Sequence, residues 1–320
     1  MSRFTRRDFI WRAAALGGGA VFAPSLSGLS AWSKDVYTAR PPGRGLQAGI
    51  RAPRAVGGGP RVHPRGHRRR SETGIVYETE DARYDAERPE EMPGAGFYRF
   101  NPNRPGELGE GGRLQMLAVD GSPRYNTTRG QTPGRALSAT RVDIDDPDPS
   151  DADTRHHAVF QQGPARGDAI FSRLEGCWYA DGAIYFNSTN GGDQNAGQVW
   201  QYRPTDADTG ELVLIFESPS RDVLNSPDNV CVSPRGGIVI CEDTDGDVFV
   251  RELSAEGDIF DFVQQPVDRT GQSGDHRVRR RMLSPDGSIL FFNIQGGTRS
   301  NGTEHGATYA LWGPREEGSL

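Results

Sequence analysis

Short apolar runs that follow tight turns recur along the second half of this 320-residue chain. Runs of β-branched and aromatic residues, bounded by Asp-Gly or Gly-Gly, are typical of strand–turn–strand structure. Each lead run has a companion run after it, and the order returns with a pitch of about 50 residues. The lead runs are 183–186, 237–240 and 288–292, and their companions are 197–202, 247–251 and 307–312.

Repeats of this length predict the blades of a β-propeller. An earlier copy, 73–77 followed by 96–100, fits the pattern with a long insertion after it. The repeat region 72–316 therefore predicts a partial propeller of about four blades. High glycine and proline content and the lack of long helical patterns after residue 35 agree with an all-β fold. A β-sandwich with coincidental spacing is the alternative.

The first 31 residues are typical of a twin-arginine signal peptide. Arg6-Arg7 precede a short, mildly apolar run of small residues that ends near Ala23. We expect the twin-arginine translocase to export the chain to the periplasm or beyond. Residues 32–71 are predicted to be irregular. No other segment is long and apolar enough to span a membrane stably once the signal is removed.

The net charge and the cysteine content indicate which ligands the chain could bind. The net charge of -6 gives no indication of nucleic-acid binding. The three cysteines, Cys177, Cys231 and Cys241, cannot all pair with one another, so at least one thiol should be free or metal-bound. Carboxylates at repeated strand ends can converge on one face, where hard cations bind.

Seven acidic or amide residues at predicted strand ends are the candidate metal ligands. Asp228-Asn229 offers one anionic and one amide oxygen, a combination that suits calcium. Cys177 is a weaker candidate, since a thiolate suits a transition metal, and Cys241 is expected in the core. For each carboxylate the alternative is a solvated or turn-capping role. The seven residues are Glu80, Asp81, Glu175, Asp228, Asn229, Glu242 and Asp243.

Other polar features have simpler interpretations. Asp193 in an Asn-Gly-Gly-Asp loop could bind calcium, but the sequence is also ordinary turn chemistry. Adjacent His156 and His157 would point to opposite faces of a strand, which argues against a shared metal. The acidic tract 143–153 is predicted to be a solvated loop. The tryptophans Trp178, Trp200 and Trp312 are expected to pack between blades.

Several motifs together resemble the PhoX family of bacterial alkaline phosphatases. They are 173–179, 187–192, 226–229, 233–237, 241–243, 284–287 and 293–295, and Thr79-Glu80-Asp81 resembles a further family block. The resemblance extends over residues 72–315. It implies a six-bladed propeller, twin-arginine secretion, and a mixed iron and calcium cluster that hydrolyses phosphate monoesters.

The chain also departs from the family pattern. Two stretches of the family's early blades, one resembling Cys-Ala-Gly-Gly and one resembling Thr-Cys-Glu-Glu, have no counterpart, so we expect a truncated propeller. Three functions therefore compete: a PhoX-like phosphomonoesterase, a non-catalytic remnant that at most binds calcium, and a calcium-dependent lactonase-type propeller. The resemblance assigns the family's iron-bound cysteine to the missing blades.

Two basic segments, 64–70 and 277–283, look unsuited to any strand and predict basic loops. At both places the family has a glutamate-containing stretch, which a shift of the reading frame by one base would restore. We hypothesise two local frameshifts, each removing a glutamate. The nucleotide sequence of the gene tests this, because codons incompatible with the shifted reading would exclude it.

Overall fold

The computed structural model describes residues 64–69, 73–151, 155, 157–244, 248–265, 278–284, 286–294, 298–299, 302–303 and 307–312. The predicted signal peptide, His156 and most of the segment 32–71 lie outside these residues. The described helices are three short 3-10 turns, η2 (Leu108–Glu110), η3 (Phe160–Gln162) and η4 (Pro164–Arg166). Among the described residues, no helix has the length and apolarity that a membrane crossing requires.

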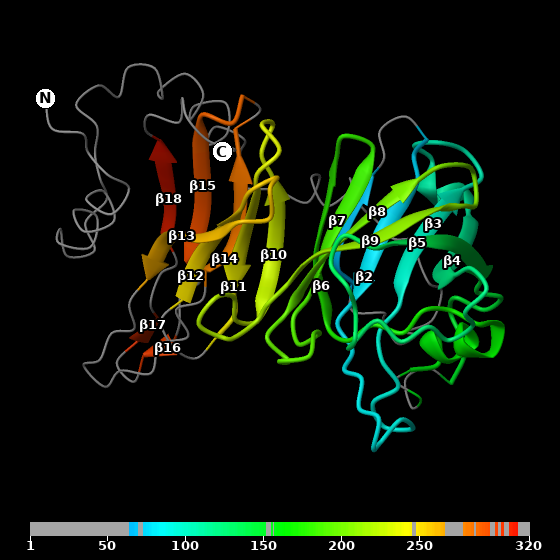
Figure 1. Cartoon of the computed structure of the whole chain (residues 1–320). Helices are drawn as coiled ribbons and strands as arrows, with labels where there is room; N and C mark the ends of the chain where they lie inside the picture. The colour runs from blue at the N-terminus through cyan, green and yellow to red at the C-terminus, as the bar shows by residue number, and fades with distance from the viewer. Residues whose placement is uncertain are drawn as a thin grey trace, which may run out of the picture.

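Antiparallel strands make up almost all of the regular structure (Figure 1). The largest sheet has nine strands in the order β1-β2-β3-β4-β5-β9-β8-β7-β6, and a second sheet has the order β10-β11-β12-β13. The bounds in the first sheet are β1 (Pro64–Arg69), β2 (Val76–Glu80), β3 (Phe97–Pro102), β4 (Gly112–Val119), β5 (Ala136–Asp143), β6 (Leu174–Ala180), β7 (Ala183–Ser188), β8 (Gln198–Pro204) and β9 (Gly210–Glu217). The second contains β10 (Pro227–Val232), β11 (Ile238–Glu242), β12 (Val248–Leu253) and β13 (Ile259–Gln265).

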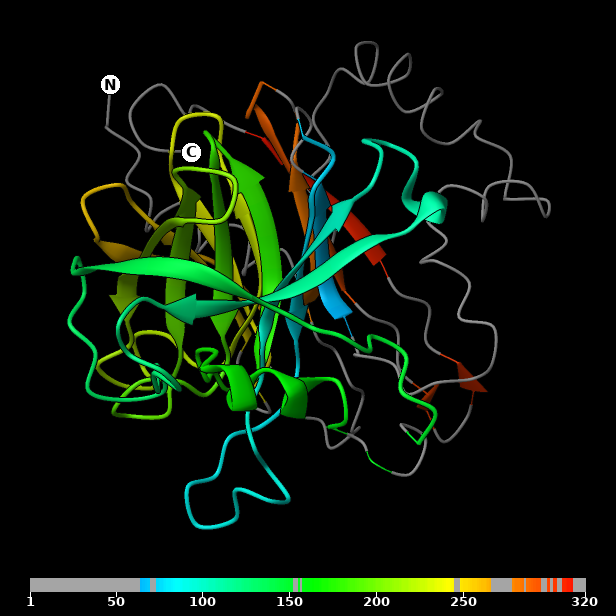
Figure 2. The same cartoon turned by 90° about the vertical axis from the view of Figure 1, so that its right-hand side faces the viewer.

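Two smaller sheets complete the described structure. The order β14-β15-β18 joins β14 (Val278–Leu283), β15 (Ile289–Ile294) and β18 (Ala307–Trp312), and the other pairs β16 (Thr298–Arg299) with β17 (Gly302–Thr303). In Figure 2 the short helices η3 and η4 lie at one end of the strands of the largest sheet.

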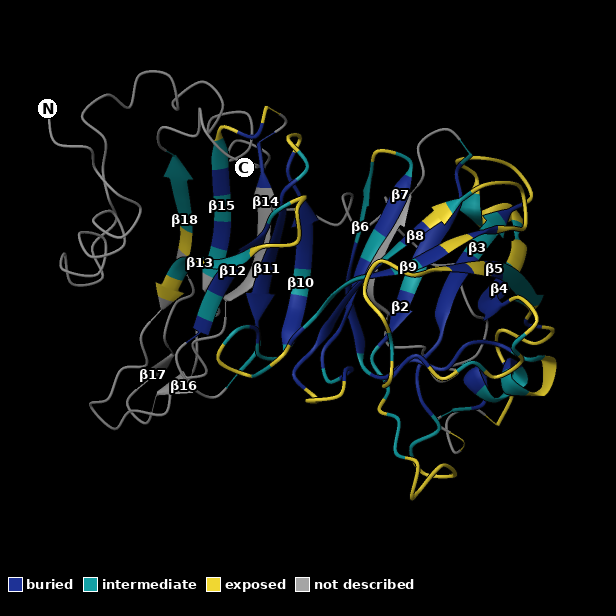
Figure 3. Cartoon of the chain, in the orientation of Figure 1, coloured by how far each residue is buried: buried dark blue, intermediate teal, exposed yellow. Residues whose placement is uncertain are grey.

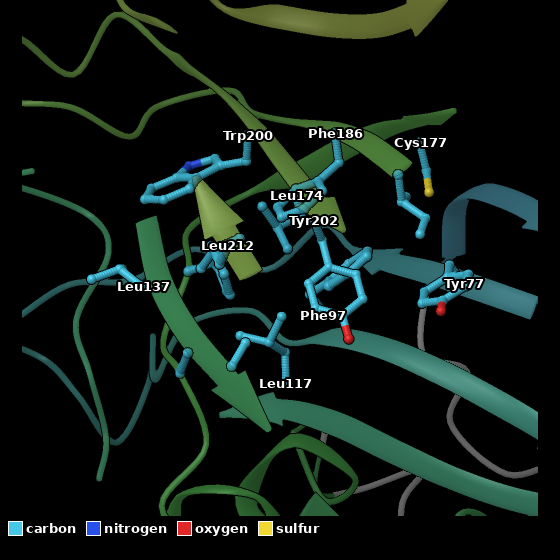
Figure 4. Close-up of a cluster of buried hydrophobic side chains, with 14 of the residues drawn as sticks. Tyr77, Phe97, Leu117, Leu137, Leu174, Cys177, Phe186, Trp200, Tyr202 and Leu212 are labelled. Atoms are coloured by element: carbon cyan, nitrogen blue, oxygen red, sulfur yellow. The ribbon is translucent and has the colours of Figure 1, made fainter. Parts of the chain in front are cut away.

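The nine-stranded sheet folds back on itself, so that β2–β5 face β6–β9 across a large apolar core (Figure 4). Aromatic rings fill this core: the rings of Phe97 and Phe186 stack with centroids 4.3 Å apart. On β7, Ile184 and Phe186 enter this core, whereas Tyr185 packs on the opposite side, against the cluster built around β10 and β11. The strand is covered on both faces, which explains its continuous apolar sequence.

The remaining sheets stack in chain order, as Figures 1 and 3 show. One apolar cluster joins β6–β9 to β10–β13, and another joins β10–β13 to β14, β15 and β18. The first strands of the successive units also lie next to one another, β1 beside β6, β6 beside β10, and β10 beside β14. Up-and-down sheets stacked through their faces are the units of a propeller. The prediction of an all-β, propeller-type fold is confirmed, while the number of blades in a complete ring stays a prediction.

The two basic segments differ from our expectation. Pro64–Arg69 forms β1 and pairs with β2, and Val278–Leu283 forms β14 and pairs with β15. Our prediction that these segments are loops was therefore wrong. A strand is stabilised mainly by its ladder and its neighbours, and these override an unfavourable side-chain composition.

Candidate functional site

The strands β1, β6, β10 and β14, each the first of a group of antiparallel strands, have an irregularity in their register close to their beginning. The shifts lie between Pro64 and Gly66 in β1, and between Val278 and Arg280 in β14. In β6 the irregularity begins after Leu174 and includes Glu175-Gly176. In β10 it begins after Pro227 and includes Asp228-Asn229. A β-bulge redirects side chains and is common beside active sites. Three of the seven predicted ligands, Glu175, Asp228 and Asn229, therefore sit at the bulges of the adjacent strands β6 and β10.

A glycine allows β6 and β10 to approach closely at these bulges. A methyl group on Gly176 would lie 2.5 Å from the backbone nitrogen of Val230 and 2.7 Å from the carbonyl oxygen of Asp228. Real Cβ atoms do not approach backbone atoms this closely. Gly176 therefore brings the strand that carries Glu175 against the strand that carries Asp228.

Replacing Gly176 with alanine should destabilise the protein by about 2–3 kcal/mol, because the methyl group collides with backbone that cannot move aside without disturbing both strands. The free energy of unfolding, measured by urea titration, tests this. Gly109→Ala is the matched control, since a Cβ there meets nothing within 4 Å. Equal stability of the two variants would contradict the close approach of β6 and β10.

Arg173 connects Glu175 to the end of β2. Its Nε donates to Oδ1 of Asp81 at 3.0 Å, and its Nη2 donates to Oε1 of Glu175 at 3.3 Å. Thr79 strengthens the link, because its hydroxyl donates to the carbonyl oxygen of Glu175. The structure thus brings the predicted residues Asp81 and Glu175 together, with a positive charge between them.

Asn187 is a member of this site that the sequence analysis missed. It is fully buried on β7, and its Nδ2 donates to the carbonyl oxygen of Asp228 at 3.1 Å. Its Oδ1 has no hydrogen-bond partner among the described residues. An orphaned buried amide oxygen is costly unless something else satisfies it. An asparagine at the end of an otherwise apolar strand was the signal that could have pointed to it.

Glu242 lies at the end of β11 within a network of donors. Its Oε1 accepts from Nε of Arg251 at 2.9 Å and from the backbone N–H of Asn225 at 2.9 Å. Its Oε2 accepts from the backbone N–H of Phe249 at 3.2 Å. Burial raises the pKa of Glu242, and the neighbouring Arg251 opposes the rise. These contacts describe a structural ion pair between β11 and β12.

Two further predicted ligands, Asp243 and Asn229, form hydrogen bonds near the start of β10. The backbone N–H of Asp243 donates to the carbonyl oxygen of Ser226 at 2.9 Å. Asn229 donates through Nδ2 to Oδ1 of Asp228 at 3.1 Å. The described residues contain no group of three His, Cys, Asp or Glu side chains arranged to hold a metal. The candidate site is therefore a mixed set of carboxylate and amide oxygens.

Glu80 points away from Glu175. Neighbouring residues of a strand face opposite sides, and Thr79 takes the side toward β6. Glu80 instead accepts, through Oε2, from the backbone N–H of Gly96 and the hydroxyl of Tyr98, both at 2.9 Å. Burial raises the pKa of Glu80 to about 7. On the same side of the sheet, burial raises the pKa of Asp168 to about 8.

The raised pKa of Asp168 predicts a loss of stability at alkaline pH in metal-free protein. The penalty is absent below the ordinary pKa near 4, grows as the pH rises, and is complete above about 8. At about 1.4 kcal/mol per pKa unit the loss amounts to several kcal/mol. Unfolding by urea with chelator at pH 5, 7 and 9 should show it. Asp168→Asn should flatten the profile and the exposed Asp120→Asn should not; identical profiles would refute the assignment.

The cysteines and the remaining polar candidates have local roles. All three cysteines are buried, with Cys177 in the largest core and Cys231 and Cys241 in the core between the later sheets, as predicted for Cys241. Asp193 accepts from the backbone N–H of Gly130 at 2.8 Å. His157 contacts the carbonyl oxygen of Glu91 at 3.2 Å.

Comparison with known proteins places the chain. No curated protein matches it. Similar solved structures include a streptogramin B lyase, with 12% identity over 80% of this chain and 71% of that chain and a TM-score of 0.31. Virginiamycin B lyase from Staphylococcus aureus shows 11% identity over 79% and 71%, with a TM-score of 0.30. A luciferin-regenerating enzyme shows 10% identity over 80% and 93%, with a TM-score of 0.32.

A family match is more informative than these distant structures. The family described as alkaline phosphatase PhoX matches residues 67–295, which is more than half of the chain. The match includes every predicted ligand, from Glu80 and Asp81 to Glu242 and Asp243. The chain belongs to the PhoX alkaline phosphatase family.

Proposed function

We propose that this chain is a phosphomonoesterase whose centre lies at the bulges of β6 and β10. The family supports the reaction class. The observation that carries the position is a set of oxygens in this region: the carboxylates of Glu175 and Asp228 at neighbouring bulges, and the orphaned, fully buried Oδ1 of Asn187, whose Nδ2 donates to the carbonyl oxygen of Asp228. Hard cations prefer such oxygen sets.

These residues fit a calcium ion better than a soft metal. Glu175, Asp228 and Asn187 would hold it, and Arg173 would fix the orientation of the Glu175 carboxylate. When bound, the cation would neutralise charge on the phosphoryl oxygens of a phosphate monoester. Iron is proposed on family grounds alone, since Cys177 lies in an apolar core. Export by the twin-arginine translocase to the periplasm or beyond is proposed on the same grounds and on Arg6-Arg7.

A second candidate function is calcium binding without catalysis. Arg173 already lies between the carboxylates of Asp81 and Glu175, at 3.0 and 3.3 Å. This positive charge reduces the number of cations that the site can accept, and therefore favours a single ion over a cluster. A single calcium ion could stabilise the junction of β6 and β10 without turning over a phosphate ester.

The purified full chain distinguishes the two candidates. Metal content and hydrolysis of p-nitrophenyl phosphate would be measured after incubation with calcium and ferric iron, with and without chelator. Turnover that disappears on chelation supports the phosphomonoesterase. Calcium binding without turnover supports the second candidate, and a folded chain that binds neither metal would exclude both.

A further inference from the structure

An unpaired positive charge lies against the largest apolar core. Arg141 is on β5, where Leu137 and Ala139 enter that core. Alternate residues of a strand share a face, so the side chain of Arg141 points to the same side. Its Nε, Nη1 and Nη2 are all buried, and none has a hydrogen-bond partner among the described residues. The proposed phosphatase centre makes no use of this group.

Aromatic rings surround the guanidinium without accepting its hydrogen bonds. Cζ of Arg141 lies 4.3 Å from the ring centroid of Tyr202 and 5.8 Å from those of Tyr77 and Phe97. Figure 4 shows these three rings together in the core. A guanidinium that stacks on rings still has its N–H donors at the edge of its plane. Cation–π attraction is weaker than the cost of burying an unpaired ion, so the charge still requires a partner.

The described part of the chain does not supply that partner. The carboxylates of Asp143 and Asp208 are about half exposed, and they pair with Arg113 and Arg99 instead. Burial lowers the pKa of Arg141, Tyr202 and Tyr77 oppose the change, and the charge of Arg99 adds to it. A buried charge must be paired or neutralised. Because arginine stays protonated, the partner that fits is an anion from outside the chain.

The position of Arg141 gives a small ion a route to the guanidinium. Arg141 is near the end of β5, and the residue as a whole is partly exposed although its nitrogens are buried. Asp143, the next residue on the same face, is exposed. Solvent therefore reaches the stem of Arg141 at this end of the core.

We propose that Arg141 forms a binding site for a small oxyanion, which accepts two parallel N–H···O hydrogen bonds from the guanidinium. The planar fork of arginine matches the oxygens of a phosphate or a carboxylate. The low dielectric constant around the aromatic rings strengthens these bonds. The anion neutralises the charge that the chain leaves unpaired. The site requires no metal and does not depend on the proposed function.

Equilibrium dialysis of the full chain tests this site, with radiolabelled inorganic phosphate and, separately, radiolabelled acetate. The background is Glu175→Gln in the presence of chelator, so that the phosphatase centre holds no metal. Adding Arg141→Met should weaken binding about tenfold or more, because the charge-assisted bonds are lost. Methionine is apolar and adaptable, so this variant should fold. Adding Arg135→Met, the same change at an exposed position, should leave binding unchanged. Preference for phosphate or for acetate identifies the class of oxyanion.

Urea unfolding gives a second measurement that a merely structural arginine would not affect. The bound oxyanion should raise the free energy of unfolding of Glu175→Gln and of its Arg135→Met derivative, but not of its Arg141→Met derivative. The proposal is overturned if folded Glu175→Gln protein binds neither phosphate nor acetate, or if Arg141→Met binds them as tightly. Such a failure would leave the proposed phosphatase centre unaffected, because neither metal nor the Glu175 carboxylate takes part in these measurements.

Discussion

Changing Glu175 to glutamine should lower phosphate ester hydrolysis at least a hundredfold and reduce the amount of bound metal. The substitution keeps the shape of the side chain and an oxygen that can still accept from Arg173, but it removes the negative charge that a cation requires. Glu175 is 3% exposed, so water cannot readily replace the lost ligand. Turnover of p-nitrophenyl phosphate and metal content per chain measure the two effects.

The matched control is Glu211→Gln, which makes the same chemical change at an exposed position of β9. It should alter neither turnover nor metal content. If Glu175→Gln is folded and retains full metal content and turnover, the bulge of β6 is not the metal centre. If only turnover falls, Glu175 acts on the substrate and the cation is held elsewhere.

Local sequence patterns predicted the strands well because the signals are local. The turn at Asp181-Gly182 and the apolar run that follows it produce the β6–β7 hairpin, and both central residues have positive φ, 48° and 76°, as such a turn requires. The neighbouring positions of Glu175 and Asp228 could likewise be predicted, since repeated strands place equivalent positions at one level of neighbouring sheets.

What the sequence could not predict depends on pairing between strands. The register of β11 with β12 sets Ile240 opposite Arg251 and brings that guanidinium to Glu242. Nothing near Glu242 in the chain indicates this partner. Asn187 was missed for the same reason, because its role depends on the approach of β10 to β7. Strands β1 and β14 were missed because they form through backbone pairing with β2 and β15, which their basic sequences do not indicate.

Breaking the ion pair between Glu242 and Arg251 should strongly destabilise the protein. Both side chains are buried, with 1% and 6% exposed. Replacing Arg251 with methionine leaves a carboxylate buried without its partner, and breaking such a pair costs about 3–5 kcal/mol. Urea unfolding measures the loss. Arg113→Met, which removes an exposed pair with Asp143 at 3.9 Å, is the control and should cost about 1 kcal/mol or less.

A double variant tells a structural pair from a metal ligand. If Glu242 is held only by Arg251 and backbone donors, then Glu242→Leu combined with Arg251→Met should recover much of the stability lost in Arg251→Met, because the uncompensated charge has gone. The metal content of that double variant should match the unmodified chain. If Glu242 is instead a cation ligand, as the sequence pattern suggested, metal content falls in every variant that lacks it, and chelation destabilises Arg251→Met further. The two interpretations therefore predict opposite results from one set of proteins.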